Sequence, residues 1–261
     1  MQNNLLHITL IQPDMVWEDK KSNLDAYEST IENIKEKKQI VVLPEMFTTG
    51  FSMQPAKLAE PMEGPSVQWM ALMARKHRCI VTGSLMIAED DKFYNRMIWM
   101  QPDGVIGYYD KRHLFGFAHE DKYYSRGDNR LIVQVNGWRI LLQVCYDLRF
   151  PEWARNTGTA YDVLLYVANW PKQRSLAWKT LLRARAIENQ SYVIGVNRVG
   201  TDPKGNIYSG DSCVIGPLGE EIWQHSDTPA CHTIILDGHS LVEKRKEFPF
   251  LNDADKFMII D

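Results

Sequence analysis

Cysteine is scarce in this sequence: its 261 residues include four, and no two of them stand in C-x-x-C spacing. Secreted domains that depend on disulfides are short and rich in cysteine, so a disulfide framework is excluded as the basis of this fold. We expect reduced thiols and a cytoplasmic location instead. Three cysteines lie in apolar segments and are expected to be inert core residues: Cys79, Cys213 and Cys231.

Long hydrophobic runs are also missing. No segment approaches the ~18 consecutive apolar residues that a membrane span requires. The N-terminal segment, MQNNLLHITLIQPD, lacks the basic region, the long apolar region and the cleavage site of a signal peptide. We therefore expect no membrane partner and no export.

An excess of basic residues is absent as well. The chain has 30 Lys and Arg residues against 33 Asp and Glu residues, which gives a net charge of −3. Nucleic-acid-binding domains normally carry a basic patch or stripe. The balance of charge therefore predicts no nucleic-acid partner.

Several catalytic and cofactor motifs are missing too. There is no H-E-x-x-H or other close histidine spacing for a metal, no G-x-S-x-G serine elbow, and no G-x-G-x-x-G or Walker sequence. We expect neither a metal nor a cofactor. Linkers, low-complexity runs and short repeats are also absent, so residues 1–261 are expected to form a single domain.

The sequence does contain an alternation of apolar strands and helices. Strands are expected at 5–12, 39–45, 79–89, 161–169 and 191–200. Helices are expected at 18–37, 66–77, 150–157, 174–188 and 239–247. The turn signals Pro102-Asp103-Gly104 and Asn136-Gly137 predict two β-hairpins. This pattern indicates an α/β fold, and by itself it leaves both a sandwich and a doubly wound sheet open.

Three reactive side chains share one context, the C-terminal end of an apolar strand. Glu45 follows IVVLP, Lys111 follows VIGYYD and Cys145 follows WRILLQV. Sites in open α/β sheets gather at such ends, so neighbouring strands would bring the three side chains together. Each residue also has an ordinary alternative: a buried cysteine as a small hydrophobe, a solvated loop glutamate, and a surface lysine.

These three residue types suit nucleophilic catalysis without histidine. A thiol attacks a carbonyl as its thiolate, and a nearby carboxylate can take that proton. An ammonium group stabilises negative charge on the sulfur and then on the tetrahedral oxyanion. The carboxylate can next pass the proton to a departing amine.

The segments around these residues, LPEMFTTGF, YYDKRHLFGFAHE and QVCYDLRFPE, resemble the three signature segments of the nitrilase superfamily of carbon–nitrogen hydrolases. The resemblance continues through 169–171, 183–200 and 209–220. It implies a four-layer αββα sandwich, a homodimer or larger homo-oligomer, and no cofactor. CYDLRFPE and KRHLF most resemble the omega-amidase branch, which hydrolyses the terminal amide of 2-oxo-dicarboxylic acid monoamides such as 2-oxoglutaramate and 2-oxosuccinamate.

The resemblance implies a role for individual residues. Cys145 matches the nucleophile that forms an acyl-thioester, Glu45 the general base, and Lys111 the lysine beside the oxyanion. Glu120, in HLFGFAHE, resembles an additional glutamate of these sites. The backbone N–H of Tyr146, directly after the nucleophile, would be the second oxyanion donor.

A substrate of this type carries a carboxylate remote from the scissile amide, and arginine binds carboxylates bidentately. Arg174 and Arg149 are the candidates. For Arg149 the alternative is a structural ion pair with Glu152, and for Arg174 it is a solvated position in the first turn of a helix. Trp170 and Phe115 are candidate apolar walls of the substrate pocket, although tryptophan is as often a core residue.

Two alternatives to the omega-amidase interpretation remain at this point. One is another substrate of the same superfamily: a nitrile, an N-carbamoyl amino acid or a deaminated glutathione, the last of which needs a longer and more open cleft. The other is a binding protein that retains the fold without catalysis. The intact set of Glu45, Lys111 and Cys145 argues against the binding protein.

Overall fold

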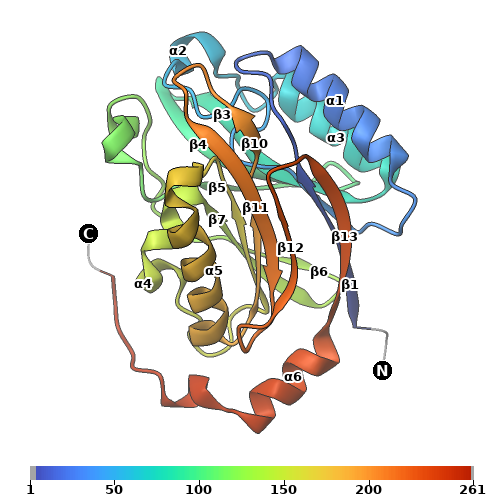
Figure 1. Ribbon diagram of the computed structural model, residues 1–261, viewed down its shortest axis with the longest axis vertical. Helices are drawn as coiled ribbons and strands as arrows, with labels where there is room; N and C mark the ends of the chain where they lie inside the picture. Colours follow the sequence, from blue (N-terminus) through green and yellow to red (C-terminus); the bar gives the residue numbers. More distant parts are fainter. Residues whose placement is uncertain (1–3, 260–261) are drawn as a thin grey trace.

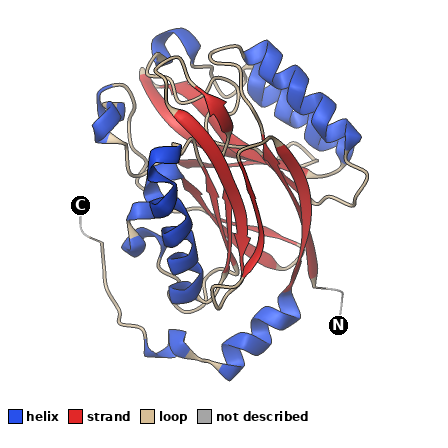
Figure 2. Ribbon diagram, viewed as in Figure 1, coloured by secondary structure: helices blue, strands red, loops and turns tan. Residues whose placement is uncertain are grey.

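The chain is built around two β-sheets. In the computed structural model, which describes residues 4–259, the strands form one six-stranded and one seven-stranded sheet (Figure 2). The order of the first sheet is β13 (Ala230–Asp237), β1 (Leu5–Gln12), β2 (Ile40–Val42), β3 (Ile80–Glu89), β4 (Lys92–Met100) and β5 (Ile106–Asp110). The order of the second sheet is β10 (Val199–Thr201), β11 (Ile207–Ile215), β9 (Tyr192–Val196), β8 (Val163–Val167), β7 (Trp138–Val144) and β6 (Ile132–Val135), and β12 (Glu221–Ser226) also pairs with β11.

Each sheet has a parallel centre and antiparallel margins. Strands β1, β2 and β3 run parallel in the first sheet, and β7, β8 and β9 do so in the second. Parallel strands need a crossover connection, which helices usually supply, and their strands are buried on both faces. This burial explains why β2 (IVV) and β8 (VLLYV) are buried at every position.

Helices cover the outer face of each sheet (Figure 1). Helices α1 (Lys20–Asn33) and α3 (Pro65–His77) pack on the first sheet, and α5 (Ser175–Asn189) packs on the second. A third apolar cluster fills the space between the sheets, with Leu6 from one sheet and Leu142 from the other. The layers therefore follow the order helix, sheet, sheet, helix, and the expected αββα sandwich is confirmed.

Helix α1 shows how local chemistry sets the element ends. The side chain of Asp19 accepts a hydrogen bond from the backbone N–H of Ser22 at 3.0 Å, which caps the first turn. The helix ends at Asn33 because Ile34 adopts an extended conformation. The predicted helix over 18–37 is therefore too long at both ends.

The remaining helices are short or lie at the edge of the sandwich. The predicted helix over 150–157 is reduced to α4 (Pro151–Ala154). Helix α2 (Pro55–Leu58) is a single turn, and α6 (Gly238–Glu247) lies along the lower edge in Figure 1, ahead of η5 (Phe250–Asp253). No helix within residues 4–259 combines the length and the apolar character that a membrane crossing would need.

Both predicted hairpins are confirmed. Strands β6 and β7 pair antiparallel, and their turn has Asn136 at φ +50° and Gly137 at φ +84°. Two consecutive positive φ angles are typical of a type I′ turn, which explains the Asn-Gly sequence. Strands β4 and β5 likewise form an antiparallel pair around Gly104.

The cysteines follow the sequence prediction with one exception. All four are free, and Cys79 and Cys213 are buried. Cys231 is exposed, so its assignment to the core was wrong. It lies on β13, an edge strand of the first sheet in which Leu236 is the only fully buried apolar side chain.

Candidate active site

Glu45, Lys111 and Cys145 lie at strand ends, as predicted, but they belong to two different sheets. Glu45 lies just beyond β2 and Lys111 directly follows β5, both in the first sheet, whereas Cys145 directly follows β7 in the second. The expectation that neighbouring strands of one sheet unite them is wrong, because β3 and β4 separate β2 from β5. The stacking of the two sheets brings these strand ends together.

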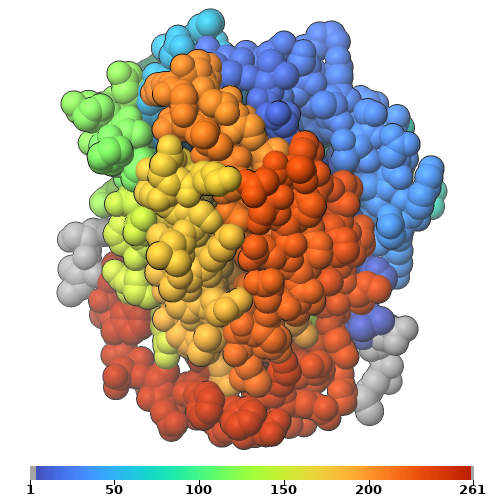
Figure 3. All heavy atoms as spheres, viewed as in Figure 1, coloured from blue at the N-terminus to red at the C-terminus, as the bar shows by residue number. Residues whose placement is uncertain are grey.

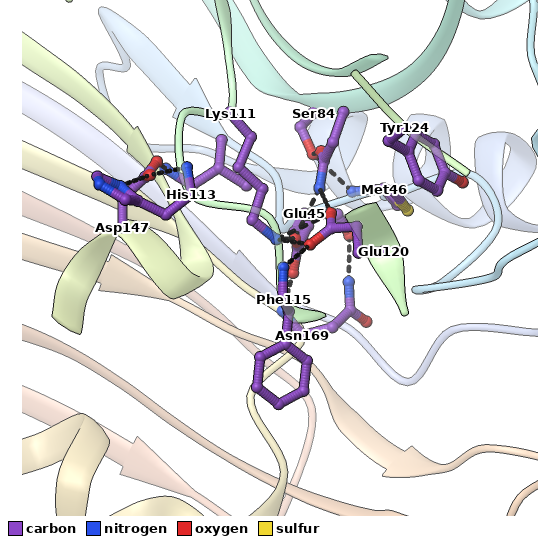
Figure 4. Close-up of polar contacts among 12 residues, drawn as sticks. Glu45, Met46, Ser84, Lys111, His113, Phe115, Glu120, Tyr124, Asp147 and Asn169 are labelled. Carbon is purple, nitrogen blue, oxygen red and sulfur yellow. Dashed lines mark hydrogen bonds and ion pairs between the residues drawn. The ribbon is translucent and has the colours of Figure 1, made fainter. Parts of the chain in front are cut away.

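Lys111 is the centre of a buried charge cluster (Figure 4). Its Nζ lies 2.9 Å from Oε1 of Glu45, and 3.0 and 2.9 Å from the two carboxylate oxygens of Glu120. All three side chains are fully buried. Burial disfavours an ammonium ion, but the two carboxylates outweigh burial and hold the pKa of Lys111 above its ordinary value. Lys111 is therefore a permanent cation within the site.

Glu120 lies in the loop after β5, where it begins η2 (Glu120–Lys122). Its Oε2 accepts the backbone N–H of Phe115 at 2.6 Å, in addition to the contact with Lys111. Burial raises the pKa of Glu120, the ammonium of Lys111 opposes that rise, and the carboxylate of Glu45 adds to it. The structure thus places Glu120 beside Lys111 in the buried charge cluster.

Two asparagines hold the carboxylate of Glu45. Asn95 of β4 donates its Nδ2–H to Oε1 at 2.8 Å, and the backbone N–H of Asn169 donates to Oε2 at 2.8 Å. Asn169 also donates its side-chain amide to the main-chain oxygen of Glu45 at 2.5 Å. Sequence analysis missed both asparagines as site residues. Asn169 carried a usable signal, since it is a polar residue close behind the buried strand β8.

Cys145 is held in an unusual backbone conformation. It is the first residue of η3 (Cys145–Arg149) and has φ +45°. A left-handed conformation of this kind costs a non-glycine residue on the order of 1–3 kcal/mol and persists only where the surroundings enforce it. The next residue, Tyr146, lies in the first turn of η3, where backbone N–H groups have no acceptor within the helix. The backbone N–H of Tyr146 donates no backbone hydrogen bond among the described residues, so it is available to bind an oxyanion.

The buried carboxylate of Asp147 enforces this turn. It accepts the backbone N–H of Val144 at 2.9 Å, the backbone N–H of His113 at 3.0 Å and the hydroxyl of Tyr109 at 2.8 Å. His113 and Tyr109 flank Lys111 in the sequence. Asp147 therefore ties the turn of the cysteine to the segment that carries the lysine.

Arg185 supports the same turn from the helix side. Its spacing from Glu188 predicts a pair on the surface of α5, and the pair is present at 3.0 Å. Arg185 is nevertheless buried, and its Nη2 also donates to the main-chain oxygen of Leu148 at 2.6 Å. The surface location was therefore wrong, and the arginine fixes η3 against α5.

The surroundings of Cys145 favour the thiol over the thiolate. Burial and the carboxylate of Glu45 raise the pKa of Cys145 well above its ordinary value, and the ammonium of Lys111 opposes them only in part. A base must then remove the proton as the sulfur attacks. Of the carboxylates in the site, Glu45 raises the pKa of this thiol most.

A cavity of about 240 Å³ opens onto Cys145. It is lined by all five residues that the sequence predicts for substrate binding: Phe115, Tyr146, Arg149, Trp170 and Arg174. The segment with η1 (Gly116–Ala118) and the hairpin of β10 and β11 also border it, at the upper end of the molecule in Figure 3. The volume falls just below the ~300–1,000 Å³ of pockets for drug-sized ligands, so the site suits a small substrate.

Both candidate arginines line the cavity without an ion pair among the described residues. The guanidinium carbon of Arg149 lies 5.2 Å from the centre of the Trp170 ring, and that of Arg174 lies 5.1 Å from the centre of the Phe115 ring. The alternative pair between Arg149 and Glu152 is not formed. Both guanidinium groups therefore remain available to an anionic ligand.

Trp170 serves the core and the cavity together. Only 4% of its surface is exposed, and its ring lies 5.5 Å from that of Trp178 in the cluster under α5. Its indole N–H donates to the main-chain oxygen of Arg174 at 2.8 Å, which fixes the backbone of that arginine. Three further lining residues, which the sequence did not predict, come from the hairpin of β10 and β11: Lys204, Asn206 and Tyr208.

The side chains of the site do not form a metal centre. Within residues 4–259, no group of three or more His, Cys, Asp and Glu side chains is arranged to hold a metal ion. The carboxylates of Glu45 and Glu120 form ion pairs with the ammonium group of Lys111 instead, and this group compensates their negative charge. The chemistry available at the site is that of a thiol, a carboxylate base and a fixed cation.

The fold and the site define a hydrolase of carbon–nitrogen bonds. Residues 7–235 match the model of the carbon-nitrogen hydrolase family, and the chain belongs to that family. The αββα fold and the resemblance to the nitrilase superfamily are thereby confirmed.

The most similar relatives narrow the class further. The chain is 45% identical over 258 residues to the omega-amidase YafV of Escherichia coli K12, covering 97% of this chain and 98% of that protein. It is 33% identical to the 2-oxoglutaramate amidase of Bacillus subtilis, with 95% and 97% covered. Among solved structures, the chain is similar to XC1258 from Xanthomonas campestris, with a TM-score of 0.95 and 42% identity over 98% of this chain and 99% of that chain. XC1258 is described as a CN-hydrolase superfamily protein with an arsenic adduct in its active site.

Proposed function

We propose that this protein is an omega-amidase, which hydrolyses the terminal amide of small 2-oxo-dicarboxylic acid monoamides such as 2-oxoglutaramate and 2-oxosuccinamate to the dicarboxylate and ammonia. The observation that carries the proposal is a small cavity with a cysteine at one end and two unpaired arginines in its walls. The full-length similarity to an omega-amidase and a 2-oxoglutaramate amidase supports it.

The first half of the reaction forms a thioester. Glu45 takes the proton from Cys145 as the sulfur attacks the amide carbonyl carbon, and a carbon–sulfur bond forms. The oxyanion is stabilised by Lys111 and by the backbone N–H of Tyr146, each worth roughly 3 kcal/mol by analogy with other oxyanion donors. The carbon–nitrogen bond then breaks, and Glu45 gives the proton to the nitrogen so that ammonia leaves.

The second half returns the enzyme to its resting form. Glu45 takes a proton from water as the water oxygen attacks the thioester carbonyl. The carbon–sulfur bond breaks and the sulfur recovers a proton by way of Glu45. The product forms as a carboxylic acid, which releases its proton to solvent and leaves as a carboxylate. Glu120 holds Lys111 in place through both halves, since it contacts the ammonium with both oxygens.

The size and charge of the cavity favour this substrate over a dipeptide-like compound, a nitrile or a neutral amide. A dipeptide-like compound such as deaminated glutathione needs a longer cleft than about 240 Å³ provides. A simple nitrile or a neutral amide leaves Arg149 and Arg174 without a partner. A purely binding protein has no use for a protonated thiol facing a base and a fixed cation.

The proposal is tested by measuring ammonia release from 2-oxoglutaramate, glutamine, an N-carbamoyl amino acid and a simple aliphatic nitrile under the same conditions. We expect rapid release from 2-oxoglutaramate and little from the other three. Release that is fastest from the nitrile or from the N-carbamoyl compound would assign the protein to another branch. A lack of release from all four would reject the proposed substrate class.

The arginines give a second prediction. Replacing Arg174 or Arg149 with alanine should raise KM for 2-oxoglutaramate about ten- to a hundredfold with little change in kcat, because a charge-assisted hydrogen bond to the substrate carboxylate is lost. Steady-state kinetics measure the split between KM and kcat. The matched control is Arg183→Ala, which removes an arginine that pairs with Glu221 on the surface of α5. Equal KM effects on a neutral amide would contradict carboxylate binding.

We further propose that residues 1–261 form a single domain and that the protein works in the cytoplasm as a homodimer or larger homo-oligomer, with no nucleic-acid or membrane partner. Four free cysteines fit a reducing compartment. Exposed apolar side chains on α5 fit a protein–protein contact, since 81% of Leu176 and 50% of Ile187 are exposed.

A further inference from the structure

Asn95 is a buried polar residue at the heart of the charge cluster. It lies on β4 with no exposed surface, and its main-chain oxygen accepts the backbone N–H of Lys111 at 3.0 Å. Its side-chain Nδ2 lies 2.8 Å from Oε1 of Glu45 and 3.2 Å from Oε1 of Glu120. One amide group therefore bridges both carboxylates of the site.

The orientation of this amide group is fixed by a second buried residue. Ser84 of β3 accepts the backbone N–H of Met46 at 2.8 Å, so its own hydroxyl proton is free to point elsewhere. That proton is donated to Oδ1 of Asn95 at 2.7 Å (Figure 4 labels Ser84 and Met46). With Oδ1 engaged as an acceptor, the two protons of Nδ2 must face the carboxylates.

The donors around Glu45 leave different roles for its two oxygens. Oε1 accepts from both Lys111 and Asn95, which occupies both of its lone pairs. Among the hydrogen bonds of residues 4–259, Oε2 accepts only the backbone N–H of Asn169, so one lone pair remains. A proton arriving from the thiol can therefore bind to Oε2 and not to Oε1.

We propose that Asn95, oriented by Ser84, is a positioning residue that keeps Glu45 and Glu120 as hydrogen-bond acceptors and directs the catalytic proton to Oε2 of Glu45. This inference rests on the proposed amidase function, because it assumes that Glu45 is the base. Asn95 touches neither the substrate nor the thiol. It acts through Glu45, and it prevents the two facing carboxyl groups from sharing a proton between them.

Removing this donor should lower the fraction of Glu45 that is deprotonated and able to act as the base, and the dependence of the rate on pH reveals this change. A carboxylate that loses a hydrogen bond is less stable in its charged form, so its pKa rises. The acid limb of the profile of kcat/KM against pH should then move to higher pH. Loss of packing alone would lower the amount of folded protein without moving that limb.

The test compares Asn95→Leu, Asn95→Asp and Ser84→Ala with the wild type. Asn95→Leu keeps the size of the side chain and removes the donor. Asn95→Asp replaces the donor with a carboxyl oxygen, which is an acceptor and adds a third negative charge when it is ionised. We expect Asn95→Leu to lower kcat/KM about ten- to a hundredfold and to move the acid limb upward by about one pH unit. The shift should be larger in Asn95→Asp and smaller in Ser84→Ala.

The matched control is Thr82→Val. Thr82 lies on the same face of β3, and its hydroxyl is buried without a hydrogen-bond partner. The Thr82→Val variant should show the same acid limb as the wild type. Its melting temperature, compared with those of the other variants, shows how much stability is lost when a buried hydroxyl is removed from β3.

A second readout separates failure of this inference from failure of the proposed function. The rate at which iodoacetamide alkylates Cys145 also depends on the base that removes the thiol proton, and it requires no substrate. An alkylation limb that moves upward in Asn95→Leu supports the role of Asn95 even if 2-oxoglutaramate is not hydrolysed. If the acid limbs of Asn95→Leu coincide with those of the wild type in both kcat/KM and alkylation, the inference is overturned, however much the rate falls.

Discussion

Replacing Cys145 with alanine is expected to lower kcat for 2-oxoglutaramate by at least about 10⁴-fold and to leave the fold unchanged. The reason for the first effect is that Cys145 supplies the only thiol among the residues that line the cavity, so the thioester cannot form. The reason for the second is that alanine adopts the same backbone conformation at φ +45° at about the same cost as cysteine. The turn itself is held by Asp147, which the substitution does not touch.

Ammonia release measures the first effect, and thermal melting measures the second. The expected melting temperature lies within a few degrees of the wild type. Cys213→Ala is the matched control, because it removes a buried thiol from β11, outside the cavity, and should retain activity. Turnover near the wild-type rate in Cys145→Ala would exclude a cysteine mechanism for this protein.

Replacing Lys111 with methionine is expected to abolish turnover and also to destabilise the protein by about 3–5 kcal/mol. The substitution removes the only ammonium group that contacts Glu45 and Glu120 within residues 4–259, and two buried carboxylates are left facing each other. It also removes one of the two proposed oxyanion donors. The combined effect distinguishes Lys111 from Cys145, whose loss affects activity alone.

The stability loss in Lys111→Met should depend on pH with a definite sign. Without the cation, burial and the facing carboxylate of Glu45 raise the pKa of Glu120 in the folded state further above that in the unfolded state. The folded state then binds more protons than the unfolded state between these two pKa values, so stability falls as pH rises. Urea unfolding should therefore show a smaller deficit near pH 5 than near pH 7.5.

Lys122→Met is the control for this experiment, since Lys122 is an exposed lysine at the end of η2. It should match the wild type in activity and in urea unfolding at both pH values. A deficit in Lys111→Met that is equal at both pH values would mean that loss of the ammonium group does not change proton binding by the folded state, and it would contradict this prediction.

Much of the architecture could be predicted from the sequence because it depends on local rules. The Asn136-Gly137 turn and the uniformly apolar strands β2 and β8 each follow from a short segment. The strand-end positions of Lys111 and Cys145 follow in the same way, because an apolar run is broken by a single reactive residue. The assignment of these strands to two facing sheets could not be predicted, because it depends on pairings across the whole chain.

The residues that hold the catalytic groups were missed for a related reason. Asn95 stands within KFYNRMIWM, where a polar residue in a strand is expected to face solvent. Its burial becomes evident only when Glu45, Glu120 and Ser84 are seen to converge on it from other elements. The shortening of the helix at 18–37 was missed because the charged residues after Ile34 continue a helical composition without continuing the helix.

The origin of the site from both sheets also has a consequence for how the protein folds. Glu45 and Asn169 are 124 positions apart along the chain, and Glu45 and Lys111 are 66 apart. Contacts between such distant segments form only after long loops have closed, which makes them late events in folding. A chain with only one sheet assembled lacks part of the proposed active site, so we expect a partly folded intermediate to have no activity. The rate at which turnover recovers after dilution from denaturant therefore reports the rate at which the two sheets dock.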